Sequence, residues 1–137
     1  MPFDNPHQTP FGDAELLGEA RSRISTRNDW VQGCFQDGNR LCIVGALSLV
    51  AGSRSFNSAN RVERRLAGVL ASQLPSKRPI WTRFRFFTAR QRLMWFNDAR
   101  HTGHADVMAL FDRAMDHLMA PALISQPRLS SVRCNPK

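Results

Sequence analysis

Four residues of this chain have the types needed for nucleophilic catalysis. Cys42 follows a polar segment and precedes an apolar one, which predicts a thiol at the N-terminus of a helix. The free N–H groups and the dipole of such a helix favour the thiolate and lower the pKa of the thiol. His104 is a candidate base, and Asp98 or Asn97 is a candidate for orienting that base. This set predicts a cysteine-dependent hydrolase or transferase.

The same residues also fit purely structural roles. Cys42 stands among Leu41, Ile43 and Val44, and a cysteine in such company is typically a small core residue. The Asn97-Asp98 pair is equally suited to turning the chain between two helices. The catalytic set is therefore an alternative hypothesis, and the sequence leaves open whether the protein is an enzyme.

A metal site formed by His101, His104 and Asp98 is a further hypothesis. The His-x-x-His spacing places two imidazoles about one helical turn apart. That spacing is common, and no cysteine at metal-ligand spacing supports it. We therefore predict no metal and no other cofactor.

Positive charge is concentrated in the middle of the chain. The 137 residues hold 19 Lys and Arg against 11 Asp and Glu, a net charge of +8. Residues 54–100 hold eleven basic residues against Glu63 and Asp98, a net +9, and the two flanks sum to −1. All but Lys77 and Lys137 of the basic residues are arginines, whose planar fork suits phosphate and carboxylate. The middle of the chain thus predicts an anionic partner.

We expect this basic stretch to form one binding face, and the sequence favours a small binding or regulatory adaptor. Its partner would be an acidic protein surface or nucleic acid, and no helix-turn-helix or zinc-finger pattern decides between them. The alternative is that the arginines solvate helix faces while the aromatic residues fill the core. The candidate partner-binding residues are Arg61, Arg64, Arg65, Arg83, Arg85, Arg90, Arg92 and Trp81.

The elements that would position these residues are helices. Residues 9–120 predict one all-α domain, a compact bundle of about five helices, between a flexible arm (1–8) and a flexible tail (121–137). Caps and apolar spacing place the helices from Thr9-Pro10 to about Thr26, over residues 42–51, from Asn57 or Ser58 to about Leu74, after Thr88, and from a Thr102 cap to about Met119, where Pro121 ends the last one.

Two segments allow more than one structure. Asp37-Gly38 is a strong turn signal, so residues 30–41 form either a short hairpin or an irregular loop. Residues 42–51 are apolar with β-branched members, and we prefer a buried helix to a strand because no comparable partner strand exists. Residues 83–86 alternate like a strand.

The cysteine count and the termini indicate the compartment. Cys34, Cys42 and Cys134 are odd in number and form no paired framework, which indicates reduced thiols. The N-terminus lacks the charged and apolar regions of a signal peptide, and no apolar run approaches the length of a membrane span. We expect a cytoplasmic protein.

A set of short motifs in the chain resembles a known family. These are Trp30-x-x-Gly33, Cys42-x-x-Gly45-Ala46, Trp95-x-Asn97-Asp98, His104-x-x-Val107 and Phe111-x-x-Ala114. Together they resemble, over about residues 14–119, a family of small bacterial and phage-borne proteins known only as a domain of unknown function. The resemblance implies one compact domain in a bacterial, intracellular setting and brings no activity with it.

Overall fold

The apolar segment after Cys42 forms the central helix of the fold. Helix α2 (Ile43–Ala51) buries six consecutive residues from Ile43 to Ser48. A helix that is apolar nearly all round is stable only when neighbours cover it on several sides. It ends at Gly52, whose φ of 73° is the left-handed conformation common after a helix C-terminus. The prediction of a buried helix over residues 42–51 is confirmed.

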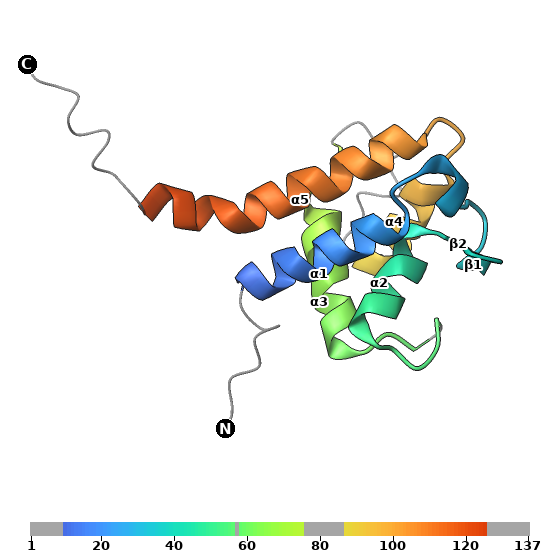
Figure 1. Cartoon of the computed structure of the whole chain (residues 1–137), viewed down its shortest axis with the longest axis horizontal. Coiled ribbons are helices and arrows are strands. Elements are labelled where there is room, and N and C mark those ends of the chain that lie inside the picture. Colours follow the sequence, from blue (N-terminus) through green and yellow to red (C-terminus); the bar gives the residue numbers. More distant parts are fainter. Residues whose placement is uncertain (1–9, 57, 76–86, 126–137) are drawn as a thin grey trace, which may run out of the picture.

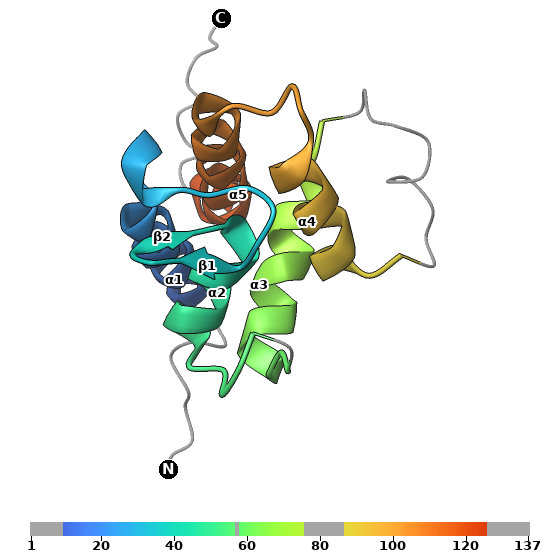
Figure 2. The same ribbon diagram turned by 90° about the vertical axis from the view of Figure 1, so that its right-hand side faces the viewer.

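Four other helices complete the bundle in this computed structural model, which describes residues 10–56, 58–75 and 87–125. Helices α1 (Pro10–Arg23) and α5 (His104–Ser125) lie antiparallel and side by side, while α3 (Arg61–Ser72) packs against α4 (Ala89–Asp98). Helix α2 contacts α1, α3 and α4 (Figures 1 and 2). The predicted all-α class is confirmed.

Residues 30–41 contain the hairpin that the sequence left open. Strands β1 (Gln36–Asp37) and β2 (Arg40–Leu41) pair antiparallel, with Asp37 opposite Arg40. The turn between them includes Gly38 at a φ of 65°, a conformation that costs glycine nothing. A 3₁₀ helix, η2 (Arg27–Asp29), precedes this hairpin, and Trp30 pairs with Leu41.

The helix caps were predicted with mixed success. The Thr88 cap of α4 is confirmed, because its hydroxyl accepts from the Gln91 N–H and the Gln91 side chain returns the bond. The predicted caps of α3 were wrong: Asn57 lies outside the described residues, and Ser58 precedes the helix by three positions. The cap is Asn60, whose Oδ1 accepts the Glu63 N–H at 2.8 Å.

Both predicted ends of α5 were wrong. Thr102 is buried in the loop before the helix, and the Gly103 N–H at the start donates to the Asp106 carboxylate at 2.8 Å. The helix also continues through Pro121 to Ser125. Proline inside a helix removes one N–H and crowds the carbonyl four residues before it, so it commonly ends a helix, but α5 is continuous across it. Figure 1 shows these last turns extending beyond α1.

Some of the other predicted bounds differ slightly from the structure, and some predictions concern residues that the structure does not describe. Helix α1 begins at Pro10 as expected and ends at Arg23, three residues earlier than predicted. The Thr9 cap, the arm 1–8 and the strand-like residues 83–86 lie outside the described residues. Of the predicted flexible tail 121–137, residues 121–125 are helical instead, and the rest lies outside the described residues. Among the residues that the structure describes, no helix is long and apolar enough to cross a membrane.

One core joins the helices. Its largest fully buried apolar side chains come from every helix: Leu17 and Ile24 at α1, Ile43 and Leu47 from α2, Leu66 and Leu70 from α3, Leu93 from α4, Leu110 and Phe111 from α5. The apolar spacing predicted for α5 is confirmed at Val107, Leu110, Phe111 and Ala114, which are all buried. The helix positions therefore follow from apolar stripes that meet around α2.

Substitution of Gly45 tests how closely α2 packs on the hairpin. A Cβ at Gly45 would clash with the Phe35 carbonyl oxygen, so Gly45→Ala forces the backbone to move. We expect a loss of about 1–3 kcal/mol in the free energy of unfolding, measured by urea denaturation.

Gly68 is the matched control. It lies in α3 with nothing within 4 Å of an added Cβ. Gly68→Ala should raise stability by about 0.5–1 kcal/mol through helix propensity. Equal effects of the two substitutions would contradict the close packing at Gly45.

Candidate functional site

The side chain of Asn97 joins three parts of the chain. This residue, 1% exposed near the end of α4, accepts through Oδ1 from the Trp30 indole at 2.8 Å and from the Ile43 N–H at 3.1 Å. Its Nδ2 donates to the Val31 carbonyl at 3.0 Å. We call these contacts the Asn97 junction. They connect the segment before the hairpin, the N-terminus of α2 and the C-terminus of α4.

Two neighbours extend the junction. One carboxylate oxygen of Asp98 accepts from the Gly33 N–H at 2.8 Å and from Asn97 Nδ2 at 2.9 Å. The Gln32 amide donates to the carbonyls of Asn97 and Ala99, at 2.8 and 3.1 Å. Helix C-termini leave such carbonyls without partners, so Gln32 satisfies the end of α4. Asn97 and Asp98 therefore bond mainly to backbone groups of the segment before the hairpin and of α2.

Cys42 is the N-terminal cap of α2. Its Sγ accepts the Gly45 N–H at 3.3 Å, and the residue is 3% exposed. Burial raises the pKa of the thiol to about 11, although the N–H groups of Gly45 and Val44 act to lower it. The predicted position at a helix N-terminus is confirmed, but the expected lowering of the pKa was wrong. Desolvation outweighs the favourable N–H groups, so the thiol is neutral near pH 7.

His104 is bonded elsewhere. Its Nε2 lies 2.7 Å from the carbonyl oxygen of Ile24, an arrangement in which Nε2 carries the proton and donates it. The ring lies against Trp30, with 5.9 Å between centroids. The hypothetical catalytic set of Cys42, Asp98 and His104 thus has each member bonded to a different backbone group.

The metal hypothesis receives no support either. Among the described residues, no group of three or more His, Cys, Asp and Glu residues is arranged to hold a metal ion. His101 is exposed and lines a shallow cavity of about 250 Å³ with Asp106 and Arg113. His104 and Asp98 have the separate contacts given above.

A small cavity lies beside Cys42. It measures about 130 Å³ and is lined by Gly33, Cys34, Phe35, Cys42, Met94 and Asp98. Cys34 is exposed, whereas Cys42 is buried. The two thiols therefore differ sharply in their access to solvent.

Two of the predicted partner-binding arginines are tied to buried acids. Arg65 makes a two-pronged ion pair with Asp13 of α1, with N–O distances of 2.9–3.1 Å. Arg90 of α4 donates from Nε to Glu63 of α3 at 3.0 Å. Buried acids need such partners, because an unpaired buried charge is strongly destabilising. These two arginines hold helices together.

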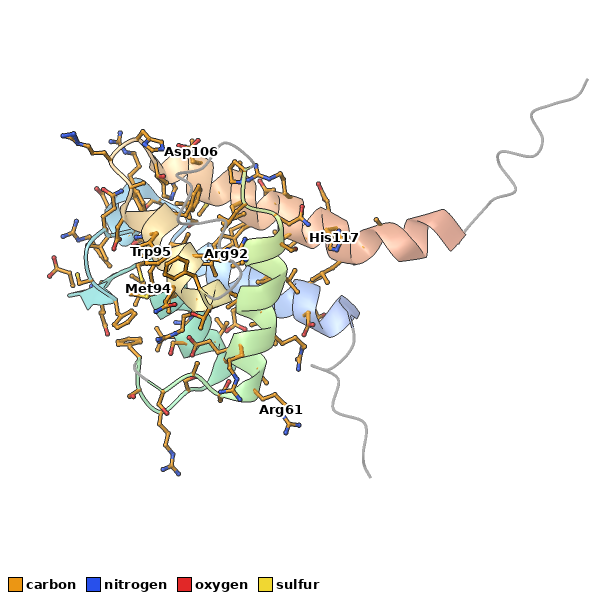
Figure 3. All side chains as sticks on the ribbon, turned by 180° about the vertical axis from the view of Figure 1, so that it is seen from behind. Arg61, Arg92, Met94, Trp95, Asp106 and His117 are labelled. Carbon is orange, nitrogen blue, oxygen red and sulfur yellow. The ribbon has the colours of Figure 1, made fainter. Side chains whose placement is uncertain are left out.

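The remaining predicted residues divide into exposed, packed and undescribed ones. Arg61 and Arg64 are exposed at the start of α3, where Arg64 also donates to the Ala59 carbonyl at 2.7 Å. Figure 3 shows Arg61 pointing away from the ribbon. Arg92 of α4 is packed instead, and its guanidinium donates to the Ala71 carbonyl at 3.4 Å. The other three, Trp81, Arg83 and Arg85, lie outside the described residues.

The sequence prediction missed the surroundings of Glu63. This residue is fully buried and accepts from Ser48 Oγ at 3.0 Å and from Ser53 Oγ at 2.7 Å, besides Arg90. The one available signal was that Glu63 is the only acid between residues 52 and 72. An isolated acid among arginines and apolar positions of a helix is a candidate for a buried pair.

Removal of the Asn97 amide tests the junction. Asn97→Ala leaves the Trp30 indole, the Ile43 N–H and the Val31 carbonyl without this partner. We expect a loss of about 2–4 kcal/mol in the free energy of unfolding, measured by urea denaturation. Asn28→Ala, in exposed η2, is the control and should change stability by less than about 0.5 kcal/mol. A similar small change for Asn97→Ala would show that the junction does not stabilise the fold.

Alkylation tests the state of the two described thiols. Iodoacetamide reacts with accessible thiolate, so we expect it to modify Cys34 in the folded protein and Cys42 only after unfolding. Peptide mass spectrometry measures both. Equal rates at the two positions in folded protein would restore Cys42 as a candidate nucleophile.

Comparison with known proteins gives a family. No curated protein and no solved structure matches the chain. One family model matches residues 8–117, and its description is a family of unknown function, DUF6197. The match agrees with the resemblance seen in the short motifs. Because it spans more than half of the 137 residues, the chain belongs to this family of unknown function.

Proposed function

We propose that this protein is a small binding or regulatory adaptor that holds an anionic partner, an acidic protein surface or nucleic acid, on an arginine-rich surface. We define the basic surface as Arg54, Arg61 and Arg64, from the loop between α2 and α3 and the first turn of α3. All three side chains are exposed.

One observation supports the proposal most: charge separation around α3. Glu63, the only acid between residues 52 and 72, is fully buried and paired with Arg90. Asp13 of α1 is buried and paired with Arg65. The acids next to α3 thus face inward, while Arg54, Arg61 and Arg64 face solvent. Clustered exposed charge of one sign attracts an oppositely charged partner and raises its association rate.

Two of the predicted partner-binding arginines, Arg65 and Arg90, are paired with buried acids. Arg65 and Arg90 contribute to stability, so reversing their charge would disturb folding as well as binding. A binding test therefore uses Arg61 and Arg64 alone. The geometry does not favour the alternative of a cysteine-dependent enzyme, because Cys42, Asp98 and His104 each bond to a different backbone group.

Charge reversal on the basic surface tests the proposal. Fluorescence anisotropy at low salt would measure binding of a glutamate-rich peptide and of a single-stranded DNA oligonucleotide. We expect at least one probe to bind, and the double variant Arg61→Glu, Arg64→Glu to weaken that binding by about tenfold or more, since each ion contact contributes salt-dependent affinity.

The matched control makes the same change in net charge elsewhere. Arg27 in η2 and Arg100 between α4 and α5 are both exposed. In Figure 2 the segment before β1 and the loop between α4 and α5 lie toward the top, and the loop between α2 and α3 lies at the bottom. Arg27→Glu, Arg100→Glu should leave affinity nearly unchanged. Equal weakening by both double variants, or no binding of either probe, would contradict the proposal.

A further inference from the structure

An apolar pocket lies next to the basic surface. It measures about 320 Å³, and Phe35, Leu49, Phe56 and Arg54 line it together with three serines, Ser48, Ser53 and Ser55. Leu49 is 44% exposed, and it is the one large apolar side chain classed as exposed among the described residues. Exposing such a side chain in water is unfavourable, so its position beside a pocket indicates a surface for an apolar group.

The walls of this pocket are fixed by contacts behind them. The rings of Phe35 and Phe56 pack at 5.5 Å between centroids, and the Arg90 guanidinium lies 5.1 Å from the Phe35 ring centre. The Ser48 and Ser53 hydroxyls both donate to buried Glu63. The ion pair between Arg90 and Glu63 therefore also supports the pocket. A preformed pocket lowers the ordering cost of binding.

The chemistry of the pocket combines an apolar volume with a positive charge. Two of its three serine hydroxyls are already donated to Glu63, which leaves them unable to donate to a ligand. Arg54 is exposed at the same pocket. Arg61 and Arg64 follow on the first turn of α3. A ligand complementary to this arrangement carries a large apolar group close to several negative charges.

We propose that the pocket binds a leucine or phenylalanine side chain of an acidic segment of a partner protein, whose carboxylates pair with Arg54, Arg61 and Arg64. This inference rests on the proposed function and names its partner class. A nucleic acid is recognised instead by stacking its bases on free aromatic faces. Here the Phe35 ring already contacts Phe56 and Arg90, and the exposed apolar residue is an aliphatic leucine.

Matched peptides separate the apolar contribution from the charge. One labelled glutamate-rich peptide carries a single leucine, and its partner peptide has serine at that position. Burial of a leucine side chain predicts roughly tenfold tighter binding of the leucine peptide at equal charge. A single-stranded DNA oligonucleotide of similar charge is the third probe. Fluorescence anisotropy measures all three at the same salt concentration.

Protein variants show which residues cause the difference in affinity between the leucine and serine peptides. Leu49→Ser removes the exposed apolar wall and should bring the two peptides to equal affinity, and circular dichroism checks that the variant stays folded at the temperature of the binding assay. Arg54→Glu should weaken both peptides alike and keep their ratio. Gly68→Ala is the control: Gly68 lies on α3 and does not line this pocket, so the variant should change neither the affinity for the leucine peptide nor that for the serine peptide.

The outcomes distinguish this inference from the proposed function. A leucine preference that Leu49→Ser abolishes supports the inference. Equal binding of the two peptides, or tighter DNA binding that Leu49→Ser does not affect, overturns the inference about the pocket. The proposed binding of an anionic partner is kept in either case. If none of the three probes binds at low salt, both the proposed function and this inference are wrong.

Discussion

The fold depends on one buried amide. Asn97 pairs with the Trp30 indole, the Ile43 N–H and the Val31 carbonyl, which belong to segments far from it in sequence. Each of these groups would lose its hydrogen bonds to water on burial, and an unpaired buried polar group costs about 1–3 kcal/mol. By satisfying them together, Asn97 allows the segment before the hairpin and the two helix ends to pack together with these groups paired. Next to this junction, Gly45 of α2 packs directly against the backbone of Phe35.

This constraint explains why residues that look catalytic in sequence have other roles. Asp98 holds the Gly33 N–H, Cys42 caps α2, and His104 binds the Ile24 carbonyl. The residues Trp30, Gly33, Cys42, Gly45, Asn97 and Asp98 lie at or next to the Asn97 junction, where each has a contact that holds the fold. At the surface, a second buried pair, Glu63 with Arg90, turns the one acid of α3 inward, while Arg61 and Arg64 of the same helix are exposed.

Much of the helical structure could be predicted because its signals are local. The Thr88 cap and the spacing of Val107, Leu110, Phe111 and Ala114 each lie within a few turns of chain, and both predictions were confirmed. The junction could not be predicted, because its partners lie 54 to 67 positions from Asn97. The total charge was readable in the sequence. The sequence did not show which arginines are neutralised, because the ion pair of Arg65 joins it to Asp13, 52 positions away. The pKa of Cys42 was misjudged for the same reason, because burial is a tertiary property.

Native-state hydrogen exchange observed by NMR tests the central claim most directly, namely that the Asn97 side chain holds the junction closed. The two protons that report on it are the Trp30 indole N–H, identified by its loss in Trp30→Phe, and the Ile43 amide. The account predicts that both exchange slowly in the native protein and become unprotected together in Asn97→Ala, while core amides of α5 stay protected. Rapid exchange of both protons in the native protein, or unchanged protection in Asn97→Ala, would contradict it.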